Sequence, residues 1–339
     1  MSGGGASREL AAHAAPDSGP GVVVGLSGPT GVGKTDVALE LARLLRTGII
    51  SCDSMQVYRG FSVLTNQPSA GKAQTVSHAL VGCVEPGVAF SVTEYASLAR
   101  PLIEQDLAHG GWALMVGGTS LYMRAALAPL ALAADGDPVL RARLEARAAA
   151  EGPGALHGEL ARLDPAAARA IDFRNVRRVV RALEAVVATG KAWSGRDDLW
   201  APDYDHPTVV VGLIVERAEL YRRIDVRAAR IVHRGAVEEV RRFRRERGLE
   251  ETRPGGTGIR SAIGYPEICR YLEGQQTLDD TVNQVAAATR RYARRQLTWL
   301  RKLGDAVIID VRDRGPEEVA QEILALALSS VRPKEPRYT

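Results

Sequence analysis

The sequence is short of cysteine and of long apolar runs, and each shortage excludes a class of protein. Its 339 residues include only three cysteines, Cys52, Cys83 and Cys269, whose scattered positions match no zinc-ligand spacing. We therefore expect reduced thiols in a cytoplasmic protein rather than a disulfide framework. No apolar run comes near the ~18 residues that cross a bilayer, so a membrane protein is not expected.

Lysine is scarce as well, since only five of the 44 Lys and Arg residues are lysine. The net charge is only +4, and an arginine-rich genome alone would produce the same ratio. The positions of the arginines say more, because many gather late in the chain, as in the basic segment 233–249. A guanidinium group binds phosphate through a planar fork, so these clusters favour a polyanionic partner such as RNA.

The central motif is a phosphate-binding loop, GPTGVGKT at residues 28–35, which matches the pattern GxxxxGK[ST]. It follows a buried-strand pattern in residues 22–26 and precedes a helical pattern in residues 36–45, as the motif requires. The glycines let backbone N–H groups surround an anion, Lys34 adds a full charge, and the Thr35 hydroxyl is a candidate Mg²⁺ ligand. The motif predicts a bound di- or triphosphate. It leaves open whether this is ATP, and whether the phosphate is transferred or only leaves.

The chain divides into a core and an insertion. Alternating strand and helix patterns in residues 21–127 and 205–329 predict an α/β core, a P-loop NTPase-like parallel sheet flanked by helices. Strand signals vanish in residues 128–204, where Ala-, Arg- and Glu-rich segments predict an inserted all-α domain. Residues 1–20, which lack a continuous apolar segment, and residues 330–339 are expected to be disordered tails.

Two polar side chains follow predicted strands of the core. Asp53 comes after the strand pattern of residues 47–52, and Thr119 comes after that of residues 112–116. Ligands of open parallel sheets bind at the carboxyl ends of the strands. The position of Asp53 at such an end therefore favours a functional role for this residue. The alternative is that Asp53 caps a turn or helix. For Thr119, a helix cap and a hydroxyl that contacts phosphate or a base are equally open.

Two kinds of reaction are compatible with these groups, which are a phosphate loop, an acidic residue at the end of a strand, and arginine-rich helices. A kinase would bind ATP and pass its γ-phosphoryl group to an acceptor. Another kind of transferase would bind a diphosphate leaving group, and Asp53 would take a proton from the nucleophile that attacks the attached carbon. Lys34, Mg²⁺ and arginine would neutralise the departing diphosphate. Composition and spacing do not decide between the two.

Six motifs, in this order along the chain, together resemble the tRNA dimethylallyltransferase family, also called tRNA isopentenyltransferases. They are GPTGVGKT (28–35), DSMQVY (53–58), VGGTSLY (116–122), RRVVRALE (177–184), IGY (263–265) and TRRYARRQLTW (289–299). The resemblance implies that a dimethylallyl group moves from dimethylallyl diphosphate to N6 of the adenine 3′-adjacent to the anticodon, and that diphosphate leaves. It implies Mg²⁺ as the cofactor and the tRNA anticodon stem-loop as the partner, gripped by the helical insertion.

The resemblance also implies roles for single residues, with Asp53, Lys34 and Thr119 as the catalytic set and Thr35 as the metal ligand. The implied diphosphate-binding residues are Gly28, Thr30, Gly31, Val32, Gly33, Lys34, Thr35, Arg223 and Arg227. The implied tRNA-binding residues are Asp53, Ser54, Met55, Gln56, Thr119, Arg141, Arg177, Arg178, Arg181, Ser261, Ile263, Gly264 and Tyr265. Among these, residues 54–56 would line the adenine, which must be splayed out of the anticodon loop to be reached.

The chain departs from the family pattern at a few positions. Gln67 stands where the family commonly has lysine, Ala79 where it has histidine, and Ser261 where it has a polar amide. These changes affect a diphosphate contact and a tRNA contact, whereas Lys34 and Asp53 are kept.

Two alternatives to this reading remain. One is an adenylate isopentenyltransferase that acts on a free nucleotide, and the other is a P-loop small-molecule kinase. A non-catalytic RNA-binding protein is less compatible with Asp53. The helical insertion argues against a free nucleotide, which would not need it. We expect a cytoplasmic monomer without membrane contact.

Overall fold

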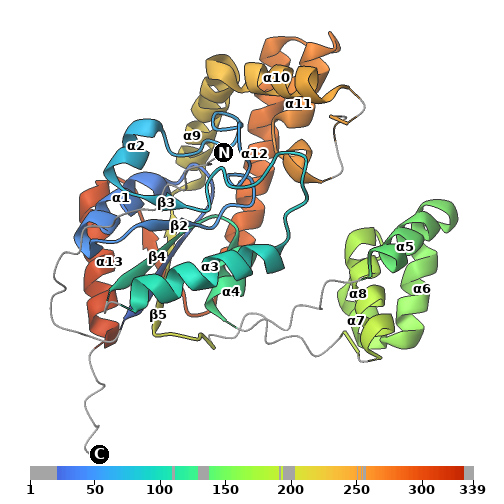
Figure 1. Ribbon diagram of the computed structural model, residues 1–339, viewed down its shortest axis with the longest axis horizontal. Helices are drawn as coiled ribbons and strands as arrows, with labels where there is room; N and C mark the ends of the chain where they lie inside the picture. The colour runs from blue at the N-terminus through green and yellow to red at the C-terminus, as the bar shows by residue number, and fades with distance from the viewer. Residues whose placement is uncertain are drawn as a thin grey trace, which may run out of the picture.

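The computed structural model describes most of the chain (Figure 1). The described residues are 21–108, 111–128, 137–190, 192–193, 203–249, 251–252, 254 and 257–331. The expected tail at 1–20 and residues 332–339 of the expected tail at 330–339 lie outside them. Residues 330 and 331 are helical, because the last helix extends to Val331.

A six-stranded parallel sheet forms the centre of the core and confirms the predicted fold class. The strands are β1 (Val22–Ser27), β2 (Ile49–Ser51), β3 (His78–Ala79), β4 (Trp112–Gly117), β5 (Thr208–Ile214) and β6 (Val307–Asp310). Their order is β3-β2-β4-β1-β5-β6, and every neighbouring pair is parallel. The central strand β1 is buried along its whole length, because helices cover both faces of a parallel sheet.

Helices cover the two faces of this sheet, as Figure 1 shows. On one face, Val22, Val24 and Leu26 of β1 pack in one apolar cluster with α1 (Lys34–Leu45) and α13 (Pro316–Val331). On the other face, Val23 packs with α3 (Val92–Leu107) and α4 (Ser120–Leu127). This alternation follows from the period of two in a strand, which points successive side chains to opposite faces of the sheet.

Above the carboxyl end of the sheet, the chain forms a helical lobe. Its elements are α2 (Ala70–Thr75), α9 (Arg217–Ile231), the π-helical turn η2 (Val232–Ala236), α10 (Val237–Arg247), the 3₁₀ turn η3 (Gly258–Ser261), α11 (Tyr265–Leu272) and α12 (Leu278–Leu300). Phe61 packs edge-on against Phe243, with ring centroids 5.3 Å apart, and also touches Tyr265. These buried rings hold the loop after β2 against α10 and α11.

The described part of the predicted insertion is entirely helical. It contains α5 (Pro138–Glu151), α6 (Pro153–Leu163), α7 (Pro165–Ala170) and α8 (Val176–Thr189). These helices share an apolar cluster of their own, which includes Leu144, Leu156, Leu160 and Leu183. Figure 1 shows them as a separate group beside the core. The exact domain boundaries at 128 and 204 stay a prediction, since residues 129–136 and 194–202 lie outside the described ranges.

None of the helices in the described ranges is long and apolar enough to cross a membrane.

Candidate active site

The phosphate loop joins β1 to α1 in a backbone conformation that requires glycine. Gly31 and Gly33 have φ angles of 87° and 107°, which L side chains rarely adopt. At Gly28, a Cβ atom would lie 2.7 Å from the Leu213 carbonyl oxygen of β5. The loop is therefore pressed against the neighbouring strand, and its turn leads directly into the N-terminus of α1.

Lys34 lies inside this loop. Its Nζ donates hydrogen bonds to the carbonyl oxygens of Gly28 and Pro29, both at 2.8 Å. The pKa of Lys34 is lowered to about 7, mainly by burial; Asp53 partly opposes this shift and Arg227 adds to it. The ammonium group is thus held where an anion would be its best additional partner, because an anion would restore the lost charge stabilisation.

A large basic cavity of about 970 Å³ opens beside the loop. Of the predicted diphosphate-binding residues, it is lined by Gly31, Gly33, Lys34, Thr35, Arg223 and Arg227. Arg222, Arg230, Arg234 and Lys72 also line it. The structure therefore brings most of the predicted set to one hollow, together with cationic side chains that the sequence did not single out.

The other three predicted loop residues do not line this cavity. Val32 is buried, and its carbonyl oxygen accepts a hydrogen bond from Arg223 Nη1 at 3.2 Å. The Thr30 N–H donates to the side chain of Gln296 in α12, at 2.8 Å. Gly28 packs closely against Leu213, and its carbonyl oxygen accepts the hydrogen bond from Lys34. These three residues therefore stabilise the conformation of the loop.

Asp53 follows β2, caps a turn and lies at the cavity beside the phosphate loop, so its capping contact does not exclude the predicted functional role. Its Oδ1 accepts the backbone N–H groups of Met55, at 2.9 Å, and Gln56, at 3.3 Å, so it caps a turn. No hydrogen bond to Oδ2 is found among the described residues. Asp53 also lines the basic cavity. One oxygen therefore fixes the carboxylate while the other stays available for chemistry.

A second, smaller cavity of about 210 Å³ lies next to the first. It shares Asp53, Arg227 and Ile231 with the basic cavity. Most of the other side chains that line it are apolar, from the loop after β2, from α9 and α12, and from the segment between η3 and α11: Met55, Leu64, Ile224, Ala228, Ala262, Ile263 and Val285. Asp53 thus stands where a basic hollow meets an apolar one.

Of the nine predicted tRNA-binding residues of the core, five line the smaller cavity: Asp53, Ser54, Met55, Ser261 and Ile263. Gln56 lines the basic cavity, and Thr119 lines neither cavity. The last two, Gly264 and Tyr265, serve the fold: a Cβ at Gly264 would meet Leu64, and the fully buried Tyr265 donates from its hydroxyl to the Thr252 carbonyl oxygen at 2.8 Å.

Thr119 begins the turn after β4 and lies beside Ser54. Its Oγ1 accepts the Ser54 backbone N–H at 3.2 Å, and its own N–H donates to the Cys52 carbonyl oxygen at 3.1 Å. Its side chain makes no cap to the following helix. The Thr119 side chain also adjoins Tyr292, whose pKa is raised to about 12 by burial and by Asp53. The structure therefore connects Thr119 to the Asp53 turn and to α12.

Glutamine side chains hold the loop after β2 in place. Gln67, expected to affect a diphosphate contact, donates from Nε2 to the carbonyl oxygens of Gln56 and Tyr58, at 2.9 and 2.8 Å. Gln56 Nε2 in turn donates to the Asn66 carbonyl oxygen at 3.0 Å. Both side chains also border the basic cavity. Gln67 thus acts as a brace between two parts of one loop.

A buried carboxylate, which sequence patterns did not single out, anchors the same loop to α10. Glu239 accepts hydrogen bonds from Ser62 Oγ and from the backbone N–H groups of Val63 and Leu64, the latter two at 2.8 Å. In the sequence, Glu239 looks like any solvent-exposed glutamate of a charged helix. Only the folded structure shows that it binds the loop after β2.

Gln296 is the other functional residue that sequence patterns missed. Its Oε1 accepts the Thr30 N–H, and its Nε2 donates to the Gly118 carbonyl oxygen at 3.0 Å. Within the motif of residues 289–299, Gln296 and Leu297 are adjacent, and helical periodicity alone does not decide which of the two is buried. In the structure Gln296 is buried and Leu297 is partly buried.

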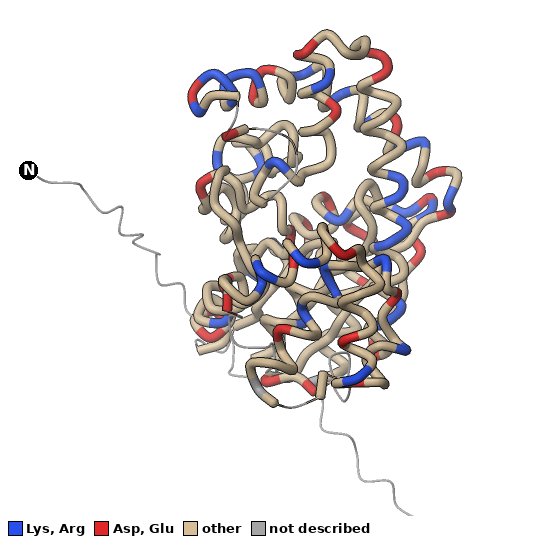
Figure 2. The backbone as a smooth tube through the Cα atoms, turned by 90° about the vertical axis from the view of Figure 1, so that its right-hand side faces the viewer, with Lys and Arg blue, Asp and Glu red and all other residues tan. Residues whose placement is uncertain are grey.

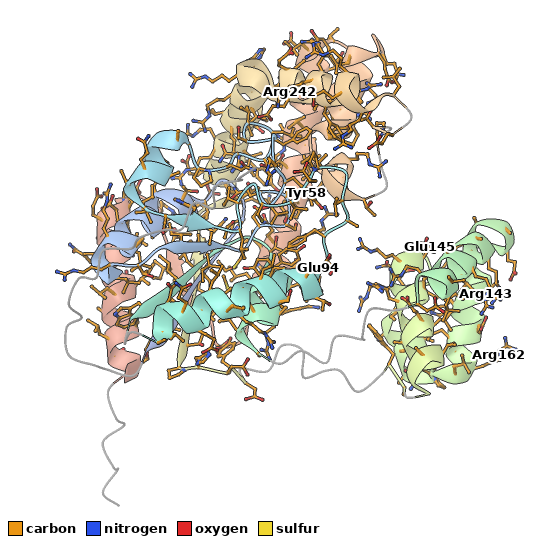
Figure 3. The ribbon with its side chains drawn as sticks, viewed as in Figure 1. Tyr58, Glu94, Arg143, Glu145, Arg162 and Arg242 are labelled. Carbon is orange, nitrogen blue, oxygen red and sulfur yellow. The ribbon has the colours of Figure 1, made fainter. Side chains whose placement is uncertain are left out.

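The predicted arginines of the insertion lie on α5 and α8. Glu184 pairs with Arg141 at 2.8 Å and with Arg181 at 3.0 Å, whereas Arg177 and Arg178 are exposed. Figure 3 shows the side chains of this helical group, with Arg143 and Arg162 also projecting from it.

The helical lobe of the core carries charges of both signs. They are seen at the top of Figure 2, at the level of α10, where Arg241 pairs with Glu238.

No group of three or more His, Cys, Asp or Glu side chains that could hold a metal by itself occurs in the described ranges. Thr35 lines the basic cavity, and no hydrogen bond of its hydroxyl is found in the described part of the chain. A hydroxyl beside a carboxylate and a bound diphosphate is a donor set that suits Mg²⁺, which commonly takes substrate phosphates as ligands.

Comparison with known proteins gives a consistent result. The family model "IPP transferase" matches residues 56–303. The tRNA dimethylallyltransferase of Thermomicrobium roseum is 40% identical over 301 residues, which cover 88% of this chain and 89% of that protein. The one from Streptomyces coelicolor is 41% identical, over 83% of this chain and 87% of that protein. The crystal structure of the full-length tRNA isopentenylpyrophosphate transferase of Bacillus halodurans is similar with a TM-score of 0.67 and 35% identity, covering 92% of this chain and 97% of that one.

The depressed pKa of Lys34 predicts that anion binding takes up a proton. A bound pyrophosphate raises the pKa of Lys34 from about 7, so affinity is greatest below that pH and falls as the pH rises above it. The dissociation constant should increase by up to about tenfold per pH unit until the pKa of the bound state is reached. Titration calorimetry at about pH 8 in buffers of different ionisation enthalpy should report uptake of nearly one proton.

Lys34→Arg is the matched control, because its guanidinium keeps its charge and should abolish the proton uptake. Pyrophosphate binding by the wild-type protein without proton uptake would contradict the coupling.

Proposed function

The chain belongs to the IPP transferase family, and from that membership and the geometry of the site we propose how it works. It transfers a dimethylallyl group to tRNA, as the six sequence motifs indicated. The observation that supports the proposed mechanism best is the position of Asp53, at the junction of a basic and an apolar cavity and with one carboxylate oxygen unengaged.

The basic cavity binds the diphosphate of the donor in this proposal. Lys34, Arg227 and the N–H groups at the start of α1 surround the diphosphate, and Arg223 supports the loop through Val32. These charges stabilise the diphosphate most as its bond to the prenyl carbon breaks, because its negative charge increases at that moment. The positive wall therefore lowers the barrier to loss of the leaving group.

Mg²⁺ remains a proposal, with Thr35 as its protein ligand and the diphosphate oxygens as further ligands. When bound, the ion would neutralise diphosphate charge as a Lewis acid. Nothing in the roles of Lys34 and Asp53 depends on its exact position.

The apolar cavity receives the acceptor base next to the prenyl chain. We propose that the acceptor is the adenine 3′-adjacent to the anticodon and that Met55 and Ile263 contact its faces. The N6 nitrogen attacks C1 of the dimethylallyl group, and the C1–O bond breaks with its electron pair going to the diphosphate. Asp53 Oδ2 takes the proton that N6 loses, while Oδ1 keeps the carboxylate in place through the Met55 and Gln56 amides.

The helical group α5–α8 binds the anticodon stem-loop in this proposal. Arg177 and Arg178 are exposed on the first turn of α8, and Arg141 and Arg181 are held side by side by Glu184. Arginine clusters of this kind bind phosphate groups of an RNA backbone. The monomeric state and the cytoplasmic location expected from the sequence stay predictions.

The choice of acceptor can be tested by following a labelled donor. Labelled dimethylallyl diphosphate should label tRNA, and it should label neither AMP nor, in the absence of acceptor, the protein. Labelled AMP would support the free-nucleotide alternative, and ATP consumption without use of the donor would support a kinase. Nuclease digestion of the product should place the label on the adenine 3′-adjacent to the anticodon.

The role of Asp53 predicts a specific loss in Asp53→Asn. The amide keeps an oxygen for the Met55 and Gln56 N–H groups but cannot take the amino proton, so kcat should fall about 10²–10⁴-fold. Donor and tRNA binding should stay within about threefold, because the turn is retained. Single-turnover kinetics and equilibrium binding measure the two effects separately.

Asp310→Asn is the control, since Asp310 Oδ1 also accepts a backbone N–H two residues on, from Arg312 at 2.9 Å, at the end of β6. It should leave turnover unchanged. Full turnover in Asp53→Asn would exclude Asp53 as the base.

The role of the helical group predicts a salt-dependent loss in Arg177→Gln. Removing one phosphate contact should weaken tRNA binding and reduce the slope of log affinity against log salt concentration by about 1. Arg147→Gln is the control, because Arg147 lies in the same group but is engaged by Glu151 and Glu159. Equal salt slopes for wild-type protein and Arg177→Gln would show that Arg177 does not contact the RNA backbone.

A further inference from the structure

The motif at residues 289–299 has no task in the mechanism so far, although it provides a buried polar side chain at the centre of the site. Gln296 of α12 is 5% exposed. Its Oε1 accepts the N–H of Thr30 in the phosphate loop, and its Nε2 donates to the carbonyl oxygen of Gly118, directly before Thr119. One side chain thus spans the loops that follow β1 and β4.

The fit is specific for an amide. Only a side chain with an acceptor and a donor at its tip can satisfy a backbone N–H and a backbone carbonyl oxygen at once. The two loops also approach closely here, since a Cβ atom on Gly118 would lie 2.0 Å from Gln296 Nε2 and 3.2 Å from the Gly28 carbonyl oxygen. Any side chain at Gly118 would displace Gln296 from between the loops.

The connection continues through the turn after β4. Thr119, the residue after Gly118, accepts the N–H of Ser54 with its Oγ1, and Ser54 is the residue after Asp53. Hydrogen bonds through Gln296 and the Gly118–Thr119 turn therefore join the phosphate loop to the turn that carries Asp53. One turn earlier on the same face of α12, Tyr292 adjoins Thr119 and Gln296.

We propose that Gln296 is a positioning residue that sets the distance between the donor diphosphate and the acceptor base. The proposal rests on the function assigned above. Because the Thr30 N–H is engaged by Gln296, the loop is fixed at this point whether or not a ligand is bound. Attack of N6 on C1 requires the nucleophile, the carbon and the leaving oxygen to lie nearly in line, so a small shift between the loops lowers the rate of transfer.

Gln296→Met tests this role, because it keeps the length and volume of the side chain and removes both hydrogen bonds. The kcat for transfer to tRNA should fall about 10–100-fold, while the dissociation constants of pyrophosphate and of tRNA stay within about threefold. Gln284→Met is the matched control. Gln284 lies on the same helix, donates to Gln276 at 2.9 Å and accepts from Arg270 at 2.6 Å, but lines neither cavity.

A second variant protects the test against a general loss of stability. In its ionised form Gln296→Glu keeps an acceptor for Thr30 but cannot donate to Gly118, so its kcat should fall as the pH rises through the pKa of the introduced carboxyl group, without loss of tRNA binding. If Gln296→Met turns over like Gln284→Met, or if either Gln296 variant loses only pyrophosphate affinity at an unchanged kcat, the positioning role is wrong. Transfer by the wild-type protein tests the proposed function itself, so the two failures are distinguishable.

Discussion

The site depends on positive charge that the fold buries with too little negative charge nearby. Lys34 and Arg227 both have a pKa lowered by burial, and Asp53 is the acidic group that opposes the shift in each. Keeping two desolvated cations close together is unfavourable unless an anion joins them. In the free protein the carbonyl oxygens of Gly28 and Pro29 hold Lys34, and in the proposed mechanism the donor diphosphate completes the charge balance.

The order of the strands brings this charge to the acceptor. In the sequence β2-β4-β1, the turn after β4 lies between the Asp53 turn and the phosphate loop. Thr119 contacts Ser54 on one side, and Gly118 is joined through Gln296 to Thr30 on the other. A sheet with β1 and β2 adjacent would leave no middle turn. The parallel order thus creates both the separation of donor and acceptor and the means of fixing it.

Sequence patterns predicted the parts of the site that depend on local chemistry. The phosphate loop, Asp53 and Thr119 each follow a strand whose apolar run is readable by itself, and the helical insertion is marked by the loss of such runs. Gln296 and Glu239 could not be found in this way, because their partners lie 266 and about 176 positions away. Helical periodicity shows which face of α12 is buried, but not that it meets two backbone groups. Gln67 braces its own loop and also lines the basic cavity, so its expected effect on a diphosphate contact stays a prediction.

The arginines of the basic cavity divide the work according to their partners. Arg222 and Arg223 both bind Glu219, and their hydrogen bonds lower its pKa to about 2, so this carboxylate stays charged and offsets part of their charge. Arg223 also donates to the Val32 carbonyl oxygen. Arg227, in contrast, forms no ion pair with any of the described side chains. The acidic group whose charge acts on it is Asp53, which raises its pKa against the effect of burial. Resemblance to the family assigned both Arg223 and Arg227 to the diphosphate. The contacts distinguish them: Arg223 is bound to Glu219 and to the phosphate loop through Val32, whereas Arg227 is the residue that supplies charge to the diphosphate in the proposed mechanism.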